Sequence, residues 1–145
     1  MATLTVTIQE DLILNGNDRS NTNTATFACN ELDHRIVTIT NVEKSILLFD
    51  SANEAGTIKD TKLEYLRITN LDSSDTVNLR VRDNAQEFMI QLRPQGSFLL
   101  TEDKLDADAT GSEETISLAQ INKISAVSSD GSGSLLEIYA ASNNV

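Results

Sequence analysis

The single histidine and the single cysteine of this chain limit the chemistry that its side chains can perform. His34 and Cys29 are five residues apart, and no motif of a nucleophile and its base surrounds them. One histidine and one cysteine cannot supply the four ligands of a structural zinc ion within one chain. The sequence also has no glycine-rich phosphate loop, nucleophile elbow or zinc-protease motif. We therefore expect a loop histidine, a core-facing cysteine and no enzymatic activity.

One segment resembles part of a calcium-binding loop. Asp106, Asp108 and Thr110 place oxygen atoms at the first, third and fifth positions, and Gly111 follows at the sixth. The twelfth position is Ser117, where such a loop requires a bidentate glutamate. The alternative is an exposed acidic loop without a metal, and this is the interpretation that we adopt. We expect no cofactor.

Arg67, Arg80 and Arg82 are the candidate interface residues. They are three of the 11 basic residues of an acidic chain, and we expect them on the outer face of one hairpin. In one interpretation they form a contact patch, because arginine is enriched at the centres of protein interfaces. In the other they pair with carboxylates that are close in the sequence, namely Glu64, Asp83 and Glu87.

The elements that position these residues are predicted to be β-strands. Between residues 65 and 82 apolar and polar residues alternate in two runs, which predicts strands with one buried and one wet face. Residues 70–75 between the runs are asparagine, aspartate, serine and leucine, a composition typical of turns. The segment is therefore predicted to be an antiparallel hairpin.

The N-terminal segment is predicted to be a second hairpin. The apolar residues from Leu4 to Ile8 alternate with threonine, and the Asn15–Gly16 pair signals a tight turn because both residues tolerate positive φ. The return strand is expected at residues 22–29, with Phe27 as its apolar anchor. Because a basic segment and a long apolar segment are missing here, we interpret this region as a strand rather than a secretion signal.

The same pattern continues along the chain and predicts the fold class. About nine or ten short strands are bounded by turn residues, a pattern typical of an antiparallel β-sandwich or a jelly-roll-like fold with little helix. We expect residues 1–145 to form a single domain, as their number allows. Part of one core is predicted to consist of Leu66, Ile68, Val77, Leu79, Val81, Phe88, Ile90 and Leu92.

Composition excludes several classes of partner. The formal net charge is −11, and such a surface repels phosphate groups, so we expect no nucleic-acid binding. No apolar run approaches ~18 residues, so we expect no membrane span. The single cysteine excludes an intrachain disulfide. The absence of tryptophan and the presence of only two tyrosines argue against sugar binding by ring stacking.

The segment from Tyr65 to Leu100 resembles small β-sandwich structural proteins of tailed-bacteriophage virions. The resemblance lies in a strand that ends in Ile68-Thr69-Asn70-Leu71-Asp72, a following pair of strands, and a Pro-Gln-Gly-Ser turn at residues 94–97 that leads into an apolar strand. This resemblance implies a non-enzymatic protein without catalytic residues, located in the virion after synthesis in the host cytoplasm. It also implies a homo-oligomer, which we expect to be a homotrimer.

Three functions follow as hypotheses. The first is a capsid decoration, or cement, protein that binds the major capsid protein or other virion proteins and stabilises the phage head. The second is a structural or adaptor protein associated with the tail or a fibre. The third, from a different class, is a carbohydrate-binding module.

Overall fold

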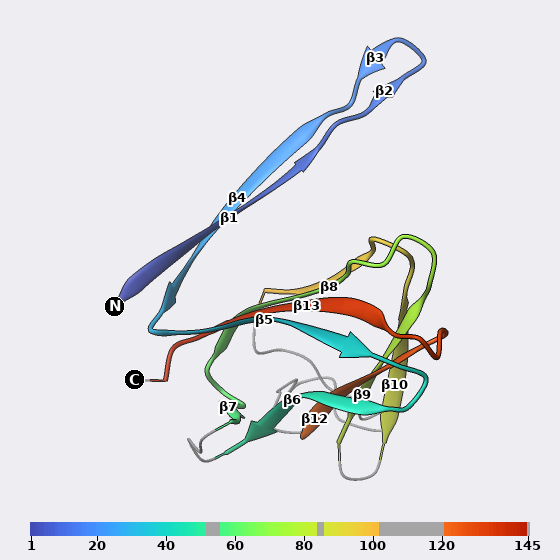
Figure 1. Ribbon diagram of the computed structural model, residues 1–145. Coiled ribbons are helices and arrows are strands. Elements are labelled where there is room, and N and C mark those ends of the chain that lie inside the picture. The colour runs from blue at the N-terminus through green and yellow to red at the C-terminus, as the bar shows by residue number, and fades with distance from the viewer. Residues whose placement is uncertain (52–55, 84–85, 102–120, 145) are drawn as a thin grey trace.

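The alternating residues of this chain form two β-sheets that pack face to face, and a long hairpin extends from them (Figure 1). The computed structural model describes residues 1–51, 56–83, 86–101 and 121–144. Within these residues the structure contains β-strands and no helix. The predicted all-β sandwich is therefore confirmed.

The first sheet has five strands. Their order is β10 (Glu87–Leu92), β9 (Val77–Arg82), β12 (Lys123–Ser128), β6 (Lys44–Asp50) and β7 (Ile58–Lys59). Neighbours are antiparallel except for β6 and β7, which are parallel. The second sheet has four antiparallel strands in the order β11 (Ser97–Leu100), β8 (Leu63–Asn70), β13 (Ser134–Ser142) and β5 (Glu31–Ile39).

The core lies between the two sheets and consists of the inward-facing residues of each strand. Leu66 and Ile68 on β8 face this core, as do Val77, Leu79 and Val81 on β9, and all five are fully buried. Leu92 is also buried, and Phe88 and Ile90 pack against the cluster. The core predicted from the sequence is therefore confirmed.

The predicted hairpin at residues 65–82 is wrong, because β8 and β9 belong to different sheets. Each strand buries one apolar face, and either sheet of a sandwich can satisfy that pattern. The turn between the strands therefore carries the chain from one sheet to the other. The expected loop around His34 is also wrong, because His34 lies within strand β5.

Asn70 holds this crossover in place. It is fully buried at the end of β8, and its Nδ2 donates hydrogen bonds to the carbonyl oxygens of Asp75 at 2.7 Å and Arg93 at 3.1 Å. Its Oδ1 accepts a hydrogen bond from the backbone N–H of Asp72 at 3.1 Å. One side chain therefore joins the β8–β9 crossover to the β10–β11 turn, which gives the asparagine of the Ile-x-Asn-Leu-Asp pattern a structural role.

The N-terminal hairpin is confirmed, but it lies outside the sandwich. Strands β1 (Ala2–Glu10) and β4 (Asn21–Cys29) pair along their whole length, and the short strands β2 (Ile13–Leu14) and β3 (Asn17–Asp18) form the tip. Asn15 and Gly16 have φ angles of 52° and 77°, as their tight turn requires. We call residues 2–29 the arm.

The arm adds two two-stranded sheets to the fold, β1 with β4 and β2 with β3, and the sandwich holds nine strands. The described residues contain thirteen strands in total, more than the nine or ten expected. The difference comes from β2, β3 and β7, which have two residues each and leave no recognisable alternation in the sequence.

Candidate interaction surfaces

The arm contacts the sandwich only near its base, in the described part of the chain. Leu4 and Val6 face the sandwich and are partly buried, whereas Ile8, on the same side of β1, is 38% exposed. Phe27 lies opposite Leu4 on β4, and its ring centroid is 5.7 Å from that of Tyr65 on β8. Beyond this contact the arm diverges from the sandwich, as Figure 1 shows.

The surface under the arm is the outer face of the four-stranded sheet, which we call the arm-side face. Its centre is aromatic: the rings of Tyr65 and Tyr139 meet edge to face at 6.1 Å, and that of His34 lies 5.2 Å from Tyr139. Burial raises the pKa of the Tyr65 hydroxyl, which agrees with its position beneath the arm. These rings provide a rigid platform against which the arm packs.

A polar network crosses the same platform. Glu137 on β13 accepts a hydrogen bond from Arg67 at 2.6 Å, and its other carboxylate oxygen lies 3.0 Å from Nε2 of His34. The guanidinium of Arg67 also lies 5.9 Å from the ring centre of Tyr139. Arg67 is therefore held on the arm-side face by a carboxylate and an aromatic ring.

A groove of about 280 Å³ separates the arm from this platform. It is lined by Leu4, Thr5, Val6 and Thr7 of the arm and by Tyr65, Arg67 and Tyr139 of the sandwich. These side chains offer apolar contact, hydroxyl groups and one cation. They include no pair of carboxylates and no nucleophile with an adjacent base.

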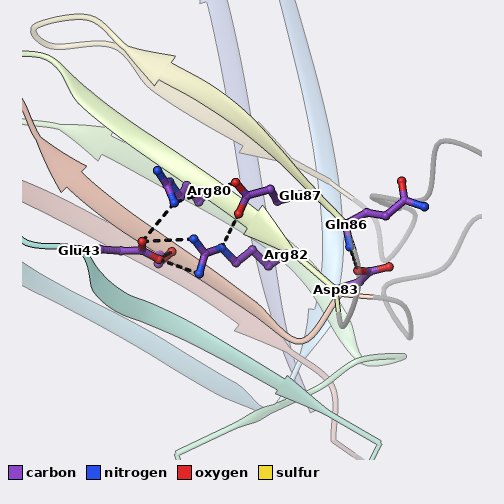
Figure 2. Close-up of polar contacts among 7 residues, drawn as sticks. Glu43, Arg80, Arg82, Asp83, Gln86 and Glu87 are labelled. Atoms are coloured by element: carbon purple, nitrogen blue, oxygen red, sulfur yellow. Dashed lines mark hydrogen bonds and ion pairs between the residues drawn. The ribbon is translucent and has the colours of Figure 1, made fainter.

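Arg80 and Arg82 lie on the other sheet, where they form an ion-pair cluster (Figure 2). Glu43, from the β5–β6 connection, lies 3.4 Å from Arg80 and 3.2 Å from Arg82. Nε of Arg82 donates to Glu87 at 2.7 Å. A hydrogen bond from Ser125 at 2.6 Å, together with the charges of Arg82 and Arg80, keeps the pKa of Glu43 below its ordinary value.

The expectation that the three arginines share one face is therefore wrong. Arg67 lies on the arm-side face, and Arg80 and Arg82 lie on the outer face of the five-stranded sheet. The expected pairing with Glu87 is confirmed. Since Glu43 and Glu87 bring two negative charges to two arginines, the cluster is not a free cationic patch.

Figure 2 also shows how the ends of β9 and β10 are joined. The backbone N–H of Gln86 donates to the carboxylate of Asp83, and the backbone N–H of Asp83 donates to the carbonyl oxygen of Gln86 at 3.1 Å. Asp83, which was expected to pair with an arginine, accordingly accepts a hydrogen bond from the backbone.

A second cavity, of about 220 Å³, lies where residues of β5 and β13 meet the segment that contains β7. Arg35 lines it, but its guanidinium pairs with Asp33 at 2.7 Å and donates to the carbonyl oxygen of Ile46. Because these contacts already engage the guanidinium of Arg35, they argue against an anion site in this cavity.

The remaining predicted sites are placed as follows. Asp106, Asp108 and Thr110 of the calcium-loop candidate lie outside the described residues. Among residues 1–51, 56–83, 86–101 and 121–144, no three histidine, cysteine or acidic side chains are grouped to hold a metal ion. His34 is bonded to Glu137, and Cys29 lies on the arm opposite Ala2.

Sequence reasoning missed Glu43 and Glu137, the two acids that organise the arginines. Glu137 could have been found, because it is the one acidic residue within the otherwise uncharged segment 134–145. Glu43 lies in a connection between strands, 37 residues before Arg80, and no periodicity points to it.

The comparisons with known proteins add no relative. Neither a protein-family model, nor a curated protein, nor a solved structure matches this chain. The described part of the chain also has no helix that is long and apolar enough to cross a membrane.

Proposed function

We propose that this chain is a non-enzymatic structural protein of a virion, and specifically a capsid decoration protein that stabilises the head of a tailed bacteriophage. The observation that carries the proposal is the arm. It extends two strands beyond the sandwich and ends in Leu12, Ile13 and Leu14, all of which are more than half exposed.

An exposed apolar tip on a long hairpin needs a partner. A two-stranded hairpin alone is at best marginally stable in water, and a cluster of exposed apolar side chains is typical of a protein-binding site. A tip that stands away from the sandwich can reach a neighbouring protein surface while the sandwich remains exposed. An assembled capsid offers such a neighbouring protein surface, to which the tip of the arm can attach.

The chemistry of the described surfaces supports binding rather than catalysis. The groove beneath the arm lacks a catalytic pair, and Arg67, Arg80 and Arg82 are paired with glutamates. The net charge of −11 disfavours a nucleic-acid ligand. A surface made of polar turns and charged networks suits a protein that remains in solvent on the outside of a particle.

The resemblance of residues 65–100 to phage β-sandwich proteins supports the virion as the location, after synthesis in the host cytoplasm. We propose that the protein acts as a homotrimer, because many weak contacts are strengthened when linked copies bind together. The major capsid protein is the proposed partner.

The test is co-sedimentation with purified, assembled particles of the phage that encodes this chain. We expect saturable binding to capsids at a fixed stoichiometry, and no binding to DNA. Binding to purified tails alone would replace the decoration role with that of a tail or fibre adaptor. Calcium-dependent retention on a glycan array, without binding to capsids or tails, would replace both with a carbohydrate-binding module.

A further inference from the structure

The arm-side face carries exposed apolar side chains outside the footprint of its own arm. Strand alternation places Leu32 and Ile36 of β5, Leu135 of β13 and Leu99 of β11 on the same side as Tyr139. All four are exposed, Ile36 by 56%. The sheet therefore offers apolar surface that the described residues of the same chain leave uncovered.

The arm offers a matching surface. Its sandwich-facing side continues from Val6 to Ile8, where the arm has left the sandwich, and the next residue on this side is Glu10. The opposite side is lined with threonine, and the hydroxyls of Thr7 and Thr24 lie 3.1 Å apart. The arm is therefore two-sided, and among the residues that the structure describes only the base of its apolar side packs against the sandwich.

Charge indicates what covers these two surfaces. Residues 1–9 and 20–30 contain no aspartate, glutamate, lysine or arginine side chain, in a chain with a net charge of −11. Two copies repel each other through most of their surface. They approach at least cost where both surfaces are uncharged, as residues 2–9 and 20–29 of the arm and the exposed apolar positions of the arm-side face are.

Within one chain the structure shows part of such a contact, because the apolar side of the arm meets the arm-side face at its base. The base of the arm packs on the arm-side face through Phe27 and Tyr65. A second chain can continue this contact where the first arm diverges. We propose that the apolar side of the arm packs on the arm-side face of a second copy of this chain.

Such a contact joins two different surfaces and is therefore head-to-tail. A head-to-tail contact whose rotation closes produces a ring. The proposal specifies the contact between copies of the proposed homotrimer, and it does not depend on binding to the capsid.

The test compares matched substitutions by sedimentation velocity over a range of concentrations, without capsids. Ile8→Asp alters the apolar side of the arm and Thr22→Asp the threonine side, with the same change in charge. On the sandwich, Ile36→Asp alters the arm-side face, and Met89→Asp alters an equally exposed position of the other sheet (56% and 51% exposed). Far-UV circular dichroism establishes that each variant is folded.

We expect the unsubstituted chain to self-associate, and Ile8→Asp and Ile36→Asp each to weaken that association about tenfold or more, because each buries an unpaired charge in the contact. Thr22→Asp and Met89→Asp should leave it within about twofold. A monomer at every concentration, or an equal effect of all four substitutions, overturns the proposal.

A cross-link gives a second readout. In a Cys29→Ser background, Ile8→Cys and Ile36→Cys chains are mixed under mild oxidation, and Thr22→Cys replaces Ile8→Cys in the control mixture. The proposal predicts a disulfide between the two different chains in the first mixture and much less in the control. Equal yields in both mixtures contradict it. Because neither readout contains capsids, failure here is distinct from failure to bind the particle.

Discussion

The ring of Phe27 on the arm lies 5.7 Å from the ring of Tyr65 on the sandwich. This contact joins the arm to the sandwich. The base of the arm is packed at this contact, and the part of the arm towards the tip is exposed to solvent. The proposed function depends on this division, because the exposed part is the part that can bind.

Phe27→Ala is expected to loosen the arm without unfolding the sandwich. An aromatic pair contributes about 0.5–1.5 kcal/mol beyond the area that it buries, so amide exchange in β1 and β4 should accelerate about two- to tenfold or more. The measurement is hydrogen exchange followed residue by residue. Thr26→Ala, on the opposite side of the same strand, is the control, and equal acceleration by both variants would show that the ring contact does not hold the arm.

Leu79→Ala is expected to destabilise the sandwich by about 2–5 kcal/mol, because it removes buried methyl groups and leaves a cavity. Leu79 is fully buried, whereas Met89 on the neighbouring strand is half exposed. Met89→Ala should therefore change stability by less than about 0.5 kcal/mol. Denaturant unfolding of both variants checks the assignment of the two faces of this sheet, and similar losses would contradict it.

Asn70→Ala is expected to cost about 1–3 kcal/mol or more, because it leaves part-buried backbone groups at Asp72, Asp75 and Arg93 without their partner. Asn78→Ala is the matched control, since the side chain of Asn78 bonds that of Gln91 on an outer face. We expect a loss of about 0.5 kcal/mol or less there. If the two alanine variants unfold at the same denaturant concentration, Asn70 does not hold the crossover.

Glu43→Gln is expected to lower stability at neutral pH and to have little effect in acid. The hydrogen bond from Ser125 and the two arginines lower the pKa of Glu43 in the folded state below its ordinary value of 4.5. Its contribution is therefore fully present above pH 4.5 and is lost as the pH falls through the folded-state pKa.

The measurement for Glu43 is thermal unfolding of the variant and the unsubstituted chain at a series of pH values. Glu10→Gln, on the arm, controls for the change in net charge. A difference between Glu43→Gln and the unsubstituted chain that grows as the pH falls below 4.5 would contradict the assigned role.

Local patterns predicted the local features of this fold. The alternation in β8, β9 and β10 identified the buried residues, and Asn15–Gly16 identified the turn of the arm. The same patterns could not say which strands are neighbours. A run such as Val77, Leu79 and Val81 buries one face equally well in either sheet, so the hairpin at residues 65–82 was predicted where the structure has a crossover.

The candidate site was predicted only in part, for the same reason. The arginines were identified, but their faces depend on the sheet to which each strand belongs. Phe27 was recognised as an apolar anchor, but its partner Tyr65 is 38 residues away and no spacing relates them. Tertiary packing places the arm outside the sandwich. The alternation of apolar and polar residues in the arm could not predict this position, because it resembles the alternation of a strand within a sheet.

The most direct test of the central claim is the amount of protein that co-sediments with assembled capsids when the tip of the arm is altered. Ile13 at the tip is 77% exposed, and Val42 in the β5–β6 connection is 70% exposed, so Ile13→Asp and Val42→Asp are matched in exposure and charge. We predict that the unsubstituted chain and Val42→Asp bind capsids at the same fixed stoichiometry, and that Ile13→Asp binds about tenfold more weakly or worse. Equal binding by Ile13→Asp and Val42→Asp, or no binding by the unsubstituted chain, would contradict the account.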